Sequence, residues 1–309
     1  MEENMYTREE IENFIDVYFS QLNLTNKEKE RYIKFIKKRQ KRNNTTDSLE
    51  YIEKKIEDLK CFFIDRGFTK EESLIFTSKV VLFCDRKELV PTLNFLITTN
   101  LIRDALLKGY LFHFNLNKFH AKKAYLTSIG NKNNNAKTIL STSIKEFTEN
   151  FNIEYDILIK YPITDELKQV WNYQARLNNE EIKKEFHLTR DEISIIYPTS
   201  IDELMTLKTI GTMNDEEIIK RYGITRQELL QKHPLNNDTL KAIKSINMAS
   251  DNAVRSIFNT TKNEVLKLRT ITTEMIKTAN KNIKLKRKNY NNEISETIKS
   301  KKKGTYPNG

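Results

Sequence analysis

Glycine and proline are scarce in this chain, with 7 and 5 among its 309 residues. β-Sandwiches and barrels need both residues for their many turns, so this composition argues against those folds. Lys, Glu, Leu and Ile, by contrast, are abundant, and helix is the element that they favour. The composition therefore predicts an all-α protein.

Cysteine is rarer still, since Cys61 and Cys84 are the only two in the chain. Two cysteines cannot build a disulfide scaffold, and we expect a reducing compartment. No apolar run approaches the ~20 residues of a membrane-spanning helix, and the acidic start MEENMYTREE lacks the features of a signal or transit peptide. These absences predict a cytoplasmic protein with no membrane partner, and association with the nucleoid stays open.

Motifs that carry chemistry are also missing. Cys61, Cys84, His113 and His120 have no close pairing, whereas zinc ligands usually stand two to four residues apart. A glycine-rich phosphate loop, a nucleophile elbow and an HExxH motif are all absent. We therefore expect no metal, no cofactor and no enzymatic activity.

Charge of one sign dominates, because 53 Lys and Arg stand against 42 Asp and Glu, a formal net charge of +11. A basic surface favours polyanions, and nucleic acid is the first of these. The simpler alternative is a biased composition that is rich in Lys, Asn and Ile, together with a basic C-terminal tail.

The most informative pattern that is present is a repeat. Pro162, Pro198 and Pro234 are 36 residues apart, and the residues around them recur with the same period. Self-similarity at such a period indicates stacked supersecondary units. The matching apolar columns are Ile182/Ile218/Val254, Phe186/Tyr222/Phe258, Ile193/Leu229/Val265, Leu204/Leu240/Ile276 and Leu207/Ile243/Ala279, with Trp171 aligned to Leu207.

Each 36-residue unit is predicted to hold a short helix, a tight corner, a capped second helix, a proline and a third helix. Thr189, Thr225 and Thr261 each precede a Glu by three residues, the spacing of a capping box. Helices this short are marginal alone, so stacking must bury their apolar columns. We therefore expect an α-solenoid of short helical repeats, about 31–36 residues each, with an N-terminal helical extension.

Four segments follow along the chain. We expect a helical pair in 1–46, looser repeats of period near 33 in 49–140, the regular 36-residue repeats in 143–280, and a basic, disordered tail in 281–309. The run NKNNN at 131–135 is the best candidate for a boundary.

One stretch resembles a known family. FFIDRGFTKEES (62–73), followed by LVPTLNFLITTNL (89–101), is similar to the repeat of mitochondrial transcription termination factor-like (mTERF-like) proteins. The resemblance covers 59–130 and reaches further if the 36-residue repeats belong to the same array. It implies a helical superhelix whose concave basic groove holds double-stranded nucleic acid.

Recurring basic residues are the candidate nucleic-acid contacts. Arg190, Arg226 and Lys262, called here the repeat cations, occupy one slot just after the cap Thr of the second helix. A cation there faces the positive end of its own helix dipole, so helix stability does not explain it, whereas a bound phosphate would. Nearby acids such as Asp191 or Glu180 could instead pair with these cations. The further candidates are Lys184, Lys220, Lys208, Lys244, Lys37, Lys38 and Arg39, the last three within the basic stretch 31–42.

These patterns favour a non-enzymatic protein that binds nucleic acid, above all double-stranded DNA, through a basic concave face in transcription or replication control. The segment 216–234 also resembles a helix-turn-helix. The alternative is a protein–protein interaction scaffold or a peptide-responsive regulator with a protein or peptide partner. A weaker third interpretation is a ribosome-associated or membrane-surface factor.

Overall fold

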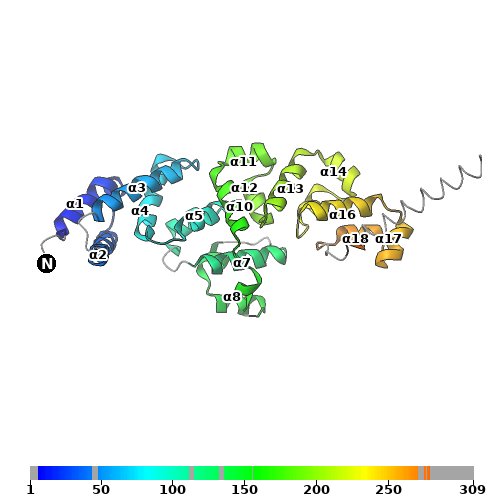
Figure 1. Ribbon diagram of the computed structural model, residues 1–309, viewed down its shortest axis with the longest axis horizontal. Coiled ribbons are helices and arrows are strands. Elements are labelled where there is room, and N and C mark those ends of the chain that lie inside the picture. Colours follow the sequence, from blue (N-terminus) through cyan, green and yellow to red (C-terminus); the bar gives the residue numbers. More distant parts are fainter. Residues whose placement is uncertain are drawn as a thin grey trace, which may run out of the picture. The chain divides into compact units, whose positions relative to one another are not determined.

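A computed structural model describes residues 6–43, 48–110, 115–131, 136–154, 156–270, 275, 277 and 278 (Figure 1). Within these residues the chain forms eighteen α-helices and no β-strand. The predicted all-α fold is therefore confirmed. Most of the polar segment 43–48, which is a plausible linker between the expected helical pair and the looser repeats, and most of the expected boundary at 131–135 fall outside the described residues, and the basic tail at 281–309 lies wholly outside them.

The chain divides into two compact units. Unit 1 comprises Met1–Lys184 with Thr189–Tyr197, and unit 2 comprises Glu185–Leu188 with Pro198–Gly309. The residues on both sides of 131–135 thus belong to the same unit.

The helices of unit 1 are α1 (Arg8–Phe19), α2 (Asn26–Asn43), α3 (Ser48–Ile64), α4 (Lys70–Val80), α5 (Leu89–Thr98), α6 (Ile102–Leu107), α7 (Leu116–Ser128), α8 (Ile144–Phe151), α9 (Ile157–Lys160), α10 (Asp165–Arg176) and α12 (Arg190–Ile196). Three short turns accompany them: η1 (Ser20–Leu22), η2 (Val81–Phe83) and η4 (Lys137–Ser141). Helix α11 (Asn179–Phe186) begins in unit 1 and ends in unit 2. Unit 2 continues with α13 (Ile201–Thr212), α14 (Asp215–Tyr222), α15 (Arg226–Leu230), α16 (Asn237–Met248), α17 (Asp251–Phe258) and α18 (Lys262–Lys267).

Capping boxes start the second helix of successive repeats, as the sequence predicts. The hydroxyls of Thr189, Thr225 and Thr261 each accept a hydrogen bond from the backbone N–H three residues on, and that Glu side chain accepts one from the Thr backbone. The reciprocal bonds satisfy amides that a helix start would leave unpaired. Pro198 and Pro234 follow α12 and α15, where the repeat places the break.

The repeated apolar columns are buried wherever the structure describes them, except that Phe258 is only partly buried. Burial of these columns is what makes short helices stable, at roughly 1.5–3 kcal/mol for each large side chain. In unit 1 the largest such residue, Trp171 of α10, packs against Phe95 of α5 with ring centroids 5.4 Å apart.

Helix α7 also places polar side chains in the core of unit 1. The Nδ1 atom of His120 lies 2.8 Å from the hydroxyl of Tyr197. Lys122 and Lys123 are each 1% exposed, although they are neighbours in sequence. The Nζ atom of Lys122 donates to the carbonyl oxygen of Thr142 at 2.9 Å, and burial lowers its pKa to about 8.

Candidate nucleic-acid interface

The solvent-facing side of α2 is entirely basic along its C-terminal part. An amphipathic helix buries residues spaced three or four apart along one side. Over residues 31–42 of α2 the buried residues are Tyr32, Ile33, Ile36 and Gln40. Every exposed residue in the same range is a cation. We call these six residues the α2 basic face: Arg31, Lys34, Lys37, Lys38, Lys41 and Arg42.

The charge of this face is largely uncompensated. Lys34, Lys37, Lys38, Lys41 and Arg42 form no ion pair with any residue that the structure describes. The acids near α2 are engaged elsewhere, since Glu28 accepts from Lys79 and Glu30 accepts from Arg8. At about 1.5 Å rise per residue, the face extends over about 17 Å.

The buried side of α2 fixes the direction of that face. Tyr32 donates a hydrogen bond to the carbonyl oxygen of Ser78, at the end of α4. Phe19 of α1 packs against the Tyr32 ring with centroids 5.4 Å apart. Because these contacts hold the apolar side inward, the lysines on the opposite side must point to solvent.

Arg39 departs from the sequence prediction. Its guanidinium lies 3.6 Å from the centre of the Tyr51 ring and forms an ion pair with Asp85, so only 13% of the side chain is exposed. Among the three predicted contacts on α2, the structure therefore presents Lys37 and Lys38 to solvent, and Arg39 joins α2 to α3 and the turn after η2. Lys34, Lys41 and Arg42 were missed as sites, although their helical spacing from Lys37 and Lys38 was a sufficient signal.

The repeat cations have protein partners. Arg226 donates from its two terminal nitrogens to the carbonyl oxygens of Ile210 (2.9 Å) and Met213, at the end of α13. Its Nε atom lies 2.7 Å from the Oδ1 atom of Asp215. Arg226 thus caps α13, two helices before its own, and also pairs with an acid.

Arg190 repeats this arrangement in unit 1. Its terminal nitrogens donate to the carbonyl oxygens of Gln174 (3.3 Å) and Leu177, and its Nε atom donates to the Oδ1 atom of Asn179 at 2.8 Å. Lys262 follows in a simpler form, donating to the carbonyl oxygen of Asn247 at 3.2 Å with Asp251 3.9 Å away. Burial lowers the pKa of Arg190 to about 10, so it stays charged at neutral pH.

These contacts correct the argument from helix dipoles. The sequence analysis considered only the helix that carries each cation, where a positive charge is unfavourable. The charge in fact lies at the C-terminal end of an earlier helix, the second before the one that carries the cation, where carbonyl groups lack partners and a cation is favourable. Helix capping therefore accounts for the recurrence of Arg190, Arg226 and Lys262 without an anion, and a phosphate contact at these residues stays a prediction.

The other predicted lysines are exposed. Lys184, Lys220 and Lys244 form no ion pair with a described residue, whereas the Nζ atom of Lys208 lies 2.9 Å from Glu185. Their role in binding is still a prediction.

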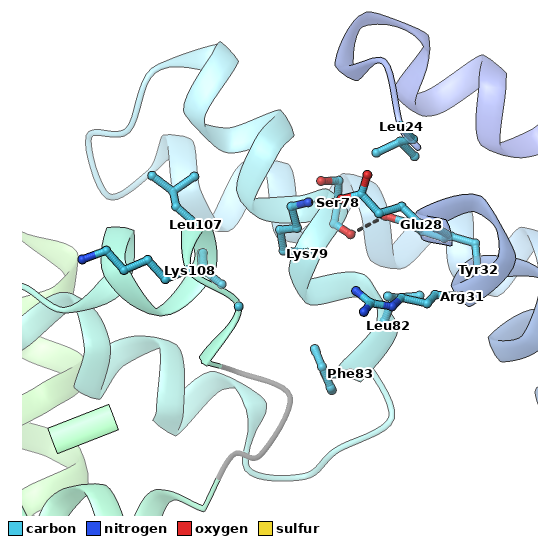
Figure 2. Close-up of a pocket in the computed structure, with 12 residues that line it drawn as sticks. Leu24, Glu28, Arg31, Tyr32, Ser78, Lys79, Leu82, Phe83, Leu107 and Lys108 are labelled. Carbon is cyan, nitrogen blue, oxygen red and sulfur yellow. Dashed lines mark hydrogen bonds and ion pairs between the residues drawn. The ribbon is translucent and has the colours of Figure 1, made fainter. Parts of the chain in front are cut away.

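A pocket of about 230 Å³ opens beside the α2 basic face (Figure 2). Figure 2 shows Glu28, Arg31 and Tyr32 of α2 on one side and Leu107 and Lys108 at the end of α6 on the other. The ammonium of Lys79 donates to Glu28 and lowers the pKa of that carboxyl to about 2. The remaining lining is mostly apolar: Leu24, Leu82, Phe83 and Leu106.

In the part of the chain that the structure describes, no group of three His, Cys, Asp or Glu side chains is placed to hold a metal ion. None of the described helices combines the length and the apolar character needed to cross a membrane.

In comparisons with known proteins, no family model matches the chain, and neither a curated protein nor a solved structure is significantly similar to it. The resemblance to mTERF-like proteins thus stays a prediction that rests on residues 59–130.

Proposed function

We propose that this chain is a non-enzymatic helical-repeat protein that binds double-stranded DNA, and that the α2 basic face supplies the main contacts. The observation that carries the proposal is the face itself, with five cations that have no ion-pair partner among the described residues. Like charges held together in this way repel one another, and a bound polyanion would relieve that repulsion.

The chemistry of the face suits the phosphate backbone better than the bases. Lysine, which supplies four of its six residues, binds phosphate as a point charge on a flexible stem. Such contacts position a protein on a duplex without reading its sequence. We therefore expect binding with little sequence preference, in which counterion release supplies most of the free energy. The proposal has three further parts. The helical repeats form a solenoid with a concave groove, the protein acts in transcription or replication control, and it is located at the nucleoid.

The test is fluorescence anisotropy of the full chain with a labelled DNA duplex across a salt series. Five phosphate contacts predict a slope of log K against log salt of about −4 to −5. Changing Lys37, Lys38 and Lys41 to Gln should weaken binding and make the slope shallower by about 2.7. An RNA duplex of the same length distinguishes DNA from RNA binding.

Two matched variants complete this test. Changing Lys145, Lys168 and Lys241 to Gln removes as much positive charge as the α2 variant does. These exposed lysines lie on helices but are not among the predicted DNA contacts, so DNA binding should be nearly unchanged. Changing Lys184, Lys220 and Lys244 to Gln tests the lysines of the repeats. The proposal is wrong if the α2 variant binds the duplex as tightly and as salt-dependently as the unaltered protein.

One observation favours the second candidate function, a scaffold that binds a protein or peptide. The pocket beside α2 joins apolar and charged groups, and Leu107 at its rim is 61% exposed. An apolar side chain of a partner could enter there. For this candidate, Leu107→Asp would abolish association with the partner, and the α2 lysine variant would preserve it.

A further inference from the structure

A second, smaller pocket lies in unit 1, away from the lysines of α2. It has a volume of about 60 Å³, several times the 10–15 Å³ that one water molecule requires. Four segments line it: the turn 66–68 after α3, the junction of α5 and α6 with Asn100, Asn178 with Asn179 at the start of α11, and Arg190 at the start of α12. Gly67 allows this approach, because its φ is +80° and a Cβ atom there would lie 2.8 Å from the Cβ atom of Asn178.

Three arginines, Arg66, Arg103 and Arg190, line this pocket. Of the three, only Arg103 has a carboxylate partner among the described residues, since it donates to Glu72 at 2.7 Å. Arg66 stacks on the ring of Phe62 at 3.5 Å and donates to the Phe62 carbonyl oxygen, while its buried Nε atom has no hydrogen-bond partner among the described groups. The bonds of Arg190 go to two carbonyl oxygens and an amide oxygen, all of them neutral.

The charges of Arg66 and Arg190 are therefore held by neutral groups. Burial, and then the nearby charge of Arg176, lower the pKa of Arg66 to about 10. Asp65 and Asp191 are acids whose charges act on Arg66 and Arg190: Asp65 precedes Arg66 in sequence, and Asp191 accepts from the side chain of Asn100 at 2.5 Å. Neither forms an ion pair with Arg66 or Arg190.

The 36-residue repeat shows which group is missing. The acid that pairs with the repeat cation is Asp215 for Arg226 and Asp251 for Lys262, in each case 11 residues before the cation. At the equivalent position in unit 1 the chain has Asn179, which offers Arg190 the same oxygen without its charge. The negative charge is thus absent at Arg190, which lines the pocket, and present at the other two repeat cations.

We propose that this pocket binds one tetrahedral oxyanion of the phosphate type, which supplies the negative charge that Asn179 lacks. Arg190 and Arg66 bind it, and guanidinium groups suit phosphate because their N–H groups can form parallel charge-assisted bonds. Two N–H groups of Arg190 and the terminal N–H groups of Arg66 that its bond to Phe62 does not use are the donors that the protein leaves for it. The site is separate from the α2 basic face and does not depend on DNA binding.

The test uses the full chain and inorganic phosphate, measured by calorimetric titration and by the rise in melting temperature, with no nucleic acid present. The decisive variant is Asn179→Asp, which places the missing carboxylate beside Arg190. It should weaken phosphate binding about tenfold or more, and its melting temperature in phosphate-free buffer should equal or exceed that of the unaltered protein. Arg66→Gln should also weaken binding, through the loss of donors.

The control is Asp215→Asn, which makes the reverse change at the equivalent residue of unit 2, and it should leave phosphate affinity unchanged. Sulfate in place of phosphate shows whether a divalent oxyanion suffices. A DNA duplex bearing a 5′-phosphate, compared with one lacking it, shows whether the bound group can belong to a nucleic acid. If the unaltered protein shows no phosphate binding, or if Asn179→Asp binds it equally well, the proposal is overturned. Duplex binding by Asn179→Asp should match that of the unaltered protein, so this result is independent of the α2 proposal.

Discussion

The Nζ atom of Lys123 lies 3.5 Å from the Oγ atom of Ser194 and forms no ion pair within the described chain. Its other neighbours are the Tyr197 ring, 5.6 Å from Nζ, and through that tyrosine the imidazole of His120. Burial lowers the pKa of Lys123 to about 7, against an ordinary value near 10.5. A lysine in such surroundings costs stability whenever it is charged.

Lys123→Met should therefore stabilise unit 1, and the gain should depend on pH. Below pH 7 the amine is charged in both the folded and the unfolded state, and the folded state bears the full cost. Between pH 7 and 10.5 the folded state holds a neutral amine and the unfolded state a charged one, so folding must release a proton, and this cost falls to zero as pH approaches 10.5. We expect a gain on the order of a few kcal/mol at pH 6 that shrinks toward zero near pH 10.5. Urea titrations at pH 6, 8 and 10 measure it.

The control for this prediction is Lys118→Met, an exposed lysine on the same helix. Its effect should be small and the same at all three pH values. A gain at Lys123 that does not change with pH would mean that apolar packing, rather than charge burial, is its cause.

Arg226→Ala should destabilise unit 2 by about 1–3 kcal/mol, because it removes two charge-assisted bonds and leaves carbonyl groups at the end of α13 without partners. Hydrogen exchange should show faster exchange in α13 and α15. Lys220→Ala, an exposed lysine that forms no ion pair with a described residue, should change stability by less than about 0.5 kcal/mol. Equal effects of the two variants would contradict the capping role.

Gly211→Ala should be among the most damaging single changes in unit 2. A Cβ atom at this position would lie 1.8 Å from the backbone oxygen of Phe186, so α13 or α11 must move. We expect a loss of about 3 kcal/mol or more, measured as a lower urea midpoint. Thr212→Ala, at the exposed next residue of the same helix, should have little effect. A variant at Gly211 with unaltered stability would show that the two helices do not approach so closely.

Glu28→Gln should weaken the contact of α2 with α4 in a pH-dependent way. The bond from Lys79 lowers the pKa of Glu28 to about 2, so its contribution is complete above the ordinary value of 4.5 and is lost as pH falls toward 2. Near pH 7 the loss should be about 0.2–1 kcal/mol, since the pair is partly exposed. Thermal unfolding at pH 3 and pH 7 should show the difference between the two proteins shrinking at the lower pH.

Much of this fold could be predicted because the residues that determine it recur along the sequence at a fixed interval. The cap threonines, the prolines and the apolar columns such as Ile182, Ile218 and Val254 recur every 36 residues, and each has a local physical meaning. Short-range rules of helix capping and side-chain periodicity were therefore sufficient to place most helices of the repeats.

The candidate sites were harder to predict, because their chemistry depends on neighbours in other helices. The residues adjacent to Arg226 in the sequence do not indicate that its partners are the carbonyl groups of Ile210 and Met213. Two adjacent lysines, such as Lys122 and Lys123, are normally expected to be exposed to solvent. Tertiary packing nevertheless buries both. The aligned repeats show that Asn179 stands where the other two repeats have Asp215 and Asp251. Only the structure shows that this difference lies at a pocket.

The reach of Arg226 back to Ile210 spans 16 residues, less than half of one 36-residue period. If a whole 36-residue repeat is duplicated or deleted, the spacing between each repeat cation and its acceptors is preserved. An equivalent bond can therefore form where the remaining repeats are joined. A gene encoding this chain could lengthen or shorten by complete repeats and keep this cap at each join, whereas a deletion of another length between the arginine and its acceptors would change their spacing and lose the bond.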